Sequence, residues 1–228
     1  MERRDPLSAS APPSAPGLPA AELARARARH AEVFGDGPRV PTADRRSIAE
    51  PVTAATARLR GGMFGEVPMM PLDAIPQIMF TLHPFQELWD RVMALSTQMQ
   101  GASGKLAPRD RQLAILRTAW LLQAPFEWGE HARISKTHGV SAEEIARVIE
   151  GSAAEGWDDH DRAILRAAEE LRAGAMIGDD TWEQLAQRLS PYQLFELCVL
   201  IGHYSTVAYF QNALRLELDR GNEGLIAR

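Results

Sequence analysis

The chain has 228 residues, of which 45% are hydrophobic, and it carries a formal net charge of -5 with a pI near 5.7. This length and hydrophobic content are enough for one sizeable core, so one main domain is the simplest expectation. The acidic balance disfavours general binding of nucleic acid and a polybasic membrane surface, since both need clustered positive charge.

The first 18 residues are rich in Pro, Ala and Ser, and we expect a disordered tail over residues 1–18 because they can bury little apolar surface. No apolar stretch typical of a secretory signal follows, and no window approaches 18 uninterrupted apolar residues. These patterns predict a cytoplasmic protein with no membrane span.

Residues 19–73 are expected to form an extended N-terminal arm. Pro19 to Phe34 has a helical pattern that ends at Gly35, and its Arg-rich face either is solvated or lies on a partner subunit. Residues 35–72 are rich in glycine and proline and are predicted to be a long connection, which either wraps the surface or forms a lid.

From residue 74 to residue 228 the pattern is that of a helical domain. Helices are expected over 75–83, from Pro84 to residue 99, over 107–123, and from Pro125 to a stop at Gly139. Ser141 and Glu144 form a capping-box pattern for the next helix. Further helices are expected over 157–174, over 179–189 and, as one long apolar helix loosened near Gly202, over 191–218. No strand is predicted, so the fold class is all-α with seven or eight helices.

The stretch FEWGEHARISKTHGV, residues 126–140, holds the candidate site. Glu127 and His131 are four residues apart and share a helix face, so the carboxylate can orient the imidazole for proton transfer near neutral pH. The alternative is an ordinary surface Glu–His pair. The spacing matches neither the zinc motifs nor the di-iron Glu-x-x-His pattern, and we expect no metal site.

Other polar residues lie in apolar surroundings near the end of the chain. His203 and Tyr204 interrupt the long apolar helix, and each either is a satisfied core or subunit-contact group or faces a pocket. The one cysteine, Cys198, lies in the apolar run FELCVLIG and is interpreted as a core residue. An oxidoreductase that uses this thiol alone is the alternative.

The run RDRQLAILRTAWLLQAPFEWGEHARISKTHGVSAEEIARV, residues 109–148, resembles the core signature of the carboxymuconolactone decarboxylase-like family. The segments TLHPFQELW, WDDHDRAILRAAEEL and LIGHYSTVAYFQNAL resemble its flanking helices, and the resemblance covers about residues 74–218. It implies an alkylhydroperoxidase D-like helical bundle, here with an extended N-terminal arm, and a homo-oligomer that is a dimer, trimer or hexamer.

In the redox branch of that superfamily, the corresponding helix carries Cys-x-x-Cys followed four residues later by His. Ala124 and Glu127 stand at the cysteine places here, and His131 stands at the histidine place. Disulfide-based peroxide reduction is therefore disfavoured, because it needs both thiols. Gln112 stands where that branch has a proton-relay glutamate.

The resemblance to the decarboxylase branch implies a cofactor-free carbon–carbon lyase acting on a small carboxylate- or lactone-bearing substrate. His131 would then be the proton donor or base, oriented by Glu127. The predicted substrate contacts are Trp128 as an apolar wall, Arg117 or Arg133 as a carboxylate clamp, and the pair His203 and Tyr204.

Two other functions remain open at this stage. The first is an isomerase or cyclase of natural-product metabolism on the same fold. The second is a non-catalytic helical oligomer that binds a small ligand or a partner protein, which would bury the face of Glu127 and His131 without a cavity. Each of Arg117 and Arg133 could equally lie on a solvated helix face.

Overall fold

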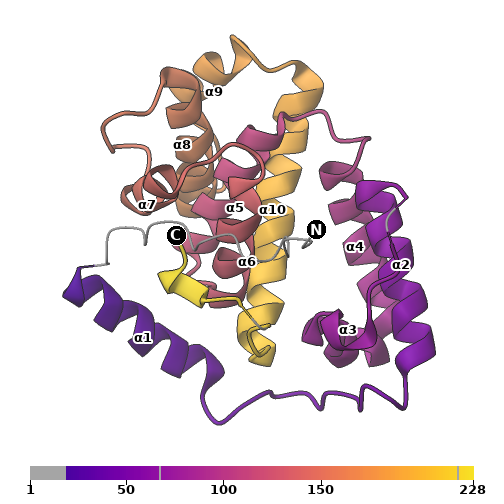
Figure 1. Ribbon diagram of the computed structural model, residues 1–228. Helices are drawn as coiled ribbons and strands as arrows, with labels where there is room; N and C mark the ends of the chain where they lie inside the picture. Colours follow the sequence, from indigo (N-terminus) through magenta and orange to yellow (C-terminus); the bar gives the residue numbers. More distant parts are fainter. Residues whose placement is uncertain (1–18, 67, 220) are drawn as a thin grey trace, which may run out of the picture.

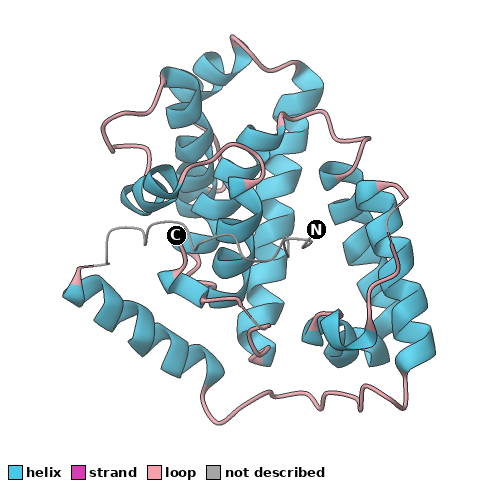
Figure 2. Cartoon of the chain, viewed as in Figure 1, coloured by secondary structure: helices cyan, strands magenta, loops and turns pink. Residues whose placement is uncertain are grey.

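The computed structural model describes residues 19–66, 68–219 and 221–228, and Figure 1 shows the path of the chain. Every regular element in these ranges is a helix and none is a strand, as Figure 2 shows, so the all-α prediction is confirmed. The expected tail over 1–18 lies outside the described residues. No helix in the described ranges is long and apolar enough to cross a membrane.

The described residues contain ten α-helices and three short 3-10 helices. In chain order the α-helices are α1 (Ala20–Phe34), α2 (Ala49–Phe64), α3 (Gln77–Leu82), α4 (Gln86–Gln100), α5 (Pro108–Leu121), α6 (Pro125–Lys136), α7 (Ala142–Glu150), α8 (Asp159–Gly174), α9 (Asp179–Ala186) and α10 (Pro191–Leu214). Helix α4 begins two residues later than predicted, because His83–Phe85 forms a 3-10 turn.

The predicted long connection over 35–72 is wrong at its centre, where α2 forms. The glycines near the end of α2 suggested a loop, but one of them serves packing: a Cβ at Gly62 would overlap the Thr97 side chain of α4. Val52 and Ala55 turn inward from α2 and are buried. Close helix–helix packing therefore explains a glycine that the sequence pattern attributed to a turn.

Helix α5 is the centre of the domain. Each residue from Asp110 to Ala119 is buried, and α5 packs against α6, α8 and α10. Helix α10 begins with a capping box formed by Ser190 and Gln193 and runs without interruption past Gly202. The predicted loosening at Gly202 is therefore wrong: this glycine is exposed, and a helical glycine costs only about 1 kcal/mol relative to alanine.

The described residues form two apolar clusters. The larger cluster contains side chains from every helix between α5 and α10, both included. The smaller cluster contains side chains of α2, α3 and α4 around Phe80 and Trp89. In Figure 1 the helices α2, α3 and α4 lie on one side of α10, and α7, α8 and α9 lie on the other. Between α4 and α10 the contacts include two hydrogen bonds between polar side chains, Ser96 to His203 and Gln100 to Tyr204.

The C-terminal segment folds back onto α6 and α1. Gly129 of α6 makes room for it, since a Cβ there would overlap the Asn222 amide oxygen and the backbone at Gly224. His30 Nε2 of α1 accepts the Leu225 N–H at 2.9 Å, and Arg228 pairs with Glu22 at 2.7 Å. The arm helix α1 is therefore held to the domain by the last residues of the chain.

The bond at His30 predicts a stability that falls with acidification. Burial lowers the pKa of His30 below its ordinary 6.5, and its Nε2 must be unprotonated to accept the Leu225 N–H. Below pH 6.5 the unfolded chain therefore binds a proton at this position more readily than the folded chain, and stability declines as the pH falls. Thermal melts between pH 7.5 and 5.5 should show a shallower decline for His30→Gln, which retains an acceptor but does not titrate. Equal slopes for wild type and variant would contradict the assignment.

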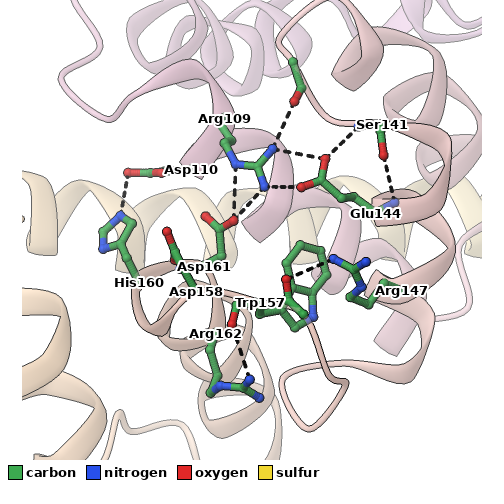
Figure 3. A network of polar contacts seen from close by, with 12 residues as sticks. Arg109, Asp110, Ser141, Glu144, Arg147, Trp157, Asp158, His160, Asp161 and Arg162 are labelled. Carbon is green, nitrogen blue, oxygen red and sulfur yellow. Dashed lines mark hydrogen bonds and ion pairs between the residues drawn. The ribbon is translucent and has the colours of Figure 1, made fainter.

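An ion network centred on Arg109 ties α5 to α7 and α8 (Figure 3). Arg109 donates to Glu144 at 2.5 Å, to Asp161 at 2.6 Å and to the Gly139 carbonyl at 3.0 Å. The bond from Arg109 holds the pKa of Glu144 below its usual range, and the same bond raises the pKa of the guanidinium. The three elements thus share one cation.

Replacing Arg109 with methionine is expected to lower the free energy of unfolding by about 2 kcal/mol at pH 7, because two carboxylates then face each other without a cation. The Arg109 side chain is 30% exposed, so we expect less than for a fully buried ion pair. Urea unfolding measures the loss. Arg166→Met, which removes the exposed pair with Glu170, is the matched control and should cost under about 0.5 kcal/mol. Equal losses in the two variants would contradict the role of the network.

Candidate active site

The candidate site is centred on the pair of Glu127 and His131 on α6. His131 Nε2 lies 3.1 Å from Glu127 Oε1, as the spacing of four residues predicts. His131 is only 6% exposed and Glu127 only 4% exposed, so the alternative of an ordinary surface pair is wrong. Pro125 at the first turn of α6 starts the helix after the break at Ala124 and sets this register.

Two glutamines extend the pair into a buried chain of hydrogen bonds. Gln112 Oε1 of α5 lies 2.7 Å from His131 Nδ1, and Gln211 Nε2 of α10 donates to Glu127 Oε2 at 2.9 Å. The Gln112 oxygen can accept from Nδ1–H, and a proton on His131 Nε2 or on Glu127 Oε1 would complete the hydrogen bond between them. The arrangement fixes the orientation of the ring.

Tyr204 lies between the two histidines of the site. Its ring meets the rings of His131 and His203 edge to face, with centroids 5.1 and 5.3 Å away. Its hydroxyl accepts from Gln100 Nε2 at 2.6 Å, and Ser96 Oγ lies 2.7 Å from His203 Nε2. Burial raises the pKa of the Tyr204 phenol and lowers the pKa of His203, so both groups are neutral near pH 7.

Among the main cavities of the described residues, none borders the pair of Glu127 and His131. The main cavities of the described residues have volumes from ≈ 180 to ≈ 770 Å³, and neither Glu127 nor His131 lines any of the five. These five cavities therefore leave no open space beside His131 for a substrate. Helix α4 covers the neighbouring Tyr204 and His203 through Gln100 and Ser96.

The three other predicted contacts lie elsewhere. Trp128 is 0% exposed and donates from Nε1 to the Ala227 carbonyl at 3.0 Å, so it is a core residue of the C-terminal contact and no wall of a pocket. Arg117 is also buried: it donates to Glu169 at 2.9 Å and to the carbonyls of Val148 and Ile149.

Arg133 has the opposite environment. Its side chain is 67% exposed and pairs with Glu130 at 2.9 Å, as expected for a solvated helix face. The structure therefore gives neither Arg117 nor Arg133 a place beside His131, and the predicted carboxylate clamp is corrected for both. The cause differs: Arg117 is occupied by the protein, and Arg133 points to solvent.

Four residues of the site were missed as site residues from the sequence, namely Ser96, Gln100, Arg111 and Gln211. Arg111 is buried beside Gln112 on α5, and its guanidinium donates from Nη1 to the Met99 carbonyl. An arginine within a run of buried residues indicates a buried charge, so Arg111 could have been predicted as a site residue from the sequence. The two residues of α4 carry no such local signal, because only the tertiary packing brings them to α10.

Metal and thiol chemistry find little support in the described ranges. No three His, Cys, Asp or Glu side chains gather there in a way that could hold a metal ion. Cys198 is half-buried on α10 and lines a separate cavity of ≈ 230 Å³, and burial raises the pKa of its thiol. The interpretation of Cys198 as a core residue is corrected, because the residue is half-buried and lines this cavity; the raised pKa of its thiol disfavours its use as a nucleophile.

Comparison with known proteins gives a family match for part of the chain. Residues 84–170 match the model of the carboxymuconolactone decarboxylase family. A similar structure is an alkylhydroperoxidase AhpD core protein from Ralstonia eutropha JMP134, with a TM-score of 0.66, 12% identity, and coverage of 80% of this chain and 93% of that one. No curated protein sequence matches the chain.

Two other solved structures share the fold. One is a protein of unknown function from Agrobacterium tumefaciens, with a TM-score of 0.56, 23% identity, and coverage of 60% of this chain and 94% of that one. The other is the debrominase Bmp8 in complex with 2,3,4-tribromopyrrole, with a TM-score of 0.63, 14% identity, and coverage of 82% and 95%. Residues 84–170 therefore form a carboxymuconolactone decarboxylase family region on an alkylhydroperoxidase AhpD-like fold, as the sequence signature implied.

Proposed function

We propose that this protein is a cofactor-independent carbon–carbon lyase that decarboxylates a small unsaturated lactone or keto acid. The observation that carries the proposal is the buried chain from Gln112 through His131 to Glu127 and Gln211. It is a chain of proton-bearing groups in a low-dielectric interior, and such a group is a suitable general acid.

In the proposed reaction the carbon–carbon bond to the substrate carboxylate breaks and CO₂ leaves. The electron pair passes into the conjugated carbonyl system, and the proton shared by His131 and Glu127 is then delivered to carbon. Water restores the proton. Glu127 keeps the imidazole oriented, and Gln112 fixes Nδ1 so that Nε2 is the transferring atom.

Access to His131 requires a movement, which we assign to α4. Its inner face meets α10 through the two side-chain hydrogen bonds at Ser96 and Gln100 and through the edge-to-face contact of Trp89 with Phe210, so opening would break all three contacts. The turn that follows α4 contains Gly101 and Gly104, which can accommodate changes in backbone angles. In this proposal the structure represents the closed state of the site.

Thiol-based chemistry is not part of the proposal. Ala124 and Glu127 occupy the places where the redox branch carries its cysteines, so peroxide reduction of that type lacks its nucleophile. The debrominase among the similar structures shares the fold at 14% identity, and its substrate is not transferred to this chain.

The test is an assay of the wild-type protein against a panel of unsaturated γ-lactone carboxylates and β-keto acids. We expect release of CO₂ from at least one of them and, in D₂O, one deuterium at the carbon that lost the carboxylate. No release above the uncatalysed rate from any member of the panel would count against the decarboxylase. Deuterium exchange without CO₂ would favour an isomerase or cyclase that uses the same groups.

One observation favours a second function, a non-catalytic helical oligomer. The pair of Glu127 and His131 is buried and borders none of the five main cavities in the described residues. Buried polar chains also occur as structural elements that fix how helices pack. Absence of turnover together with a His131→Gln variant that unfolds would support this alternative.

We also propose that the chain works as a homo-oligomer. Large apolar side chains remain exposed on α4 and α10, among other places, and such surfaces often mark subunit contacts. On these two helices they are Leu88, Leu95, Tyr192, Phe195 and Tyr209. The mass of the protein in solution, measured by light scattering, distinguishes a dimer, trimer or hexamer from a monomer.

A further inference from the structure

Arg111 is a buried cation whose hydrogen-bonding capacity is largely unused. The residue is 6% exposed, its Nη1 donates to the Met99 carbonyl, and its Nε has no acceptor among the described residues. The turn after α4 encloses the guanidinium closely, since a Cβ at Gly104 would lie 2.8 Å from Nη1. An arginine held this way presents an unoccupied Nε edge in a low-dielectric surrounding.

The charge of Arg111 is only partly compensated by the protein. The carboxylate that acts on it electrostatically is Glu196, whose oxygens accept the backbone N–H groups of Lys105 and Leu106. No hydrogen bond joins Glu196 to Arg111 in the described ranges. Burial lowers the pKa of the guanidinium, which remains charged near pH 7 and bears a desolvation cost. An anion at the Nε edge would remove this penalty.

The position of Arg111 connects it to the proton-transferring pair. Its charge acts on Tyr204, whose ring meets His131 edge to face, and on His138, which His131 also influences. The next residue, Gln112, bonds His131 through Oε1, and its own Nε2 is buried without an acceptor among the described residues. Two unpaired donors thus lie on consecutive residues beside the candidate site.

We propose that Arg111 is the carboxylate anchor of the site, taking a substrate carboxylate side-on at its Nε edge while Gln112 donates to a second oxygen of the same ligand. The assignment rests on the proposed function, since it names the substrate class as small carboxylates. It replaces Arg117 and Arg133, which the structure occupies elsewhere or exposes. Helix α4, which supplies the Met99 carbonyl, closes over the bound anion.

The test observes the unpaired donor directly by ¹⁵N NMR of the full chain. The Nε–H resonance of Arg111, assigned by its loss in Arg111→Lys, is followed during titration with acetate and benzoate at constant ionic strength. Acetamide and benzamide are the neutral counterparts. We expect a saturable shift with the carboxylates, none with the amides, and binding weakened about tenfold or more in Arg111→Lys, because lysine offers no side-on pair of donors. Arg133→Lys is the matched control and should bind as wild type does.

Three results would overturn the anchor: no shift with either carboxylate, an equal shift with chloride, or unchanged affinity in Arg111→Lys. If that variant does not fold, the Arg111 Nε–H is assigned instead by through-bond correlation to its own side chain and backbone, and the wild-type titration then decides. The anchor and the proposed function fail separately. His131→Gln should still bind benzoate, so binding without turnover on any substrate leaves the anchor standing and removes the lyase. If turnover depends on His131 but KM is the same in Arg111→Lys, the lyase stands and the anchor is removed.

Discussion

Replacing His131 with glutamine is expected to lower the proposed turnover by between about 10²- and 10⁴-fold, which is the usual contribution of a general acid or base. Glutamine can still bond to Gln112 and Glu127, the two partners of the imidazole, but it cannot give up a proton near pH 7. The fold should therefore survive. The measurement is kcat on the substrate found in the panel, with circular dichroism to show that the variant is folded.

The matched control is His138→Gln on the same stretch of chain. His138 is half-buried and makes no bond in the chain from Gln112 to Gln211. We expect its turnover to stay within about threefold of wild type, since His138 makes no hydrogen bond to the reacting groups and glutamine keeps a polar side chain there. Full turnover in a folded His131→Gln protein would remove His131 from the mechanism.

Replacing Trp128 with alanine is expected to lower the free energy of unfolding by about 3–5 kcal/mol, the range for removing a large aromatic side chain from a core. Trp128 is 0% exposed, its ring packs against Trp120 with centroids 5.0 Å apart, and Arg228 lies over its face at 5.8 Å. The indole also bonds the Ala227 carbonyl. The alanine variant should therefore also release the C-terminal segment. Urea unfolding followed by circular dichroism measures the loss.

Trp128→Phe separates packing from binding. Phenylalanine keeps most of the apolar contact and loses the bond to Ala227, so we expect a loss of only about 1 kcal/mol. If Trp128 were the wall of a substrate pocket, as first predicted, this change would alter KM. An unchanged KM is expected, and a severalfold rise would restore the earlier prediction.

Local signals predicted most of the helices. The capping box of Ser141 and Glu144, the proline at the start of α6 and the glycine stop at Gly35 are all where the sequence places them. The failures concern glycines. Gly62 permits close contact between helices and Gly202 lies on an exposed face, and neither purpose can be distinguished from a turn without knowledge of the neighbours.

The site was predictable only along one helix. The spacing of Glu127 and His131 fixes their contact because both lie on α6. Their other partners come from residues 19 and 84 positions away, so the completed chain of hydrogen bonds depends on tertiary packing. The arginines show the same limit: Arg117 is occupied by Glu169, which lies 52 positions later.

Enclosure of α5 on nearly all sides bears on how such a protein could acquire new specificities. A residue of α5 cannot be exchanged without disturbing several packed neighbours at once. Helix α4 is different, since one face contacts the site and the other lies in solvent. Substitutions at Ser96 and Gln100 could therefore change which substrates enter the site, while the acid–base pair of Glu127 and His131 is kept. A library confined to those two codons would be an economical starting point for redirecting the protein.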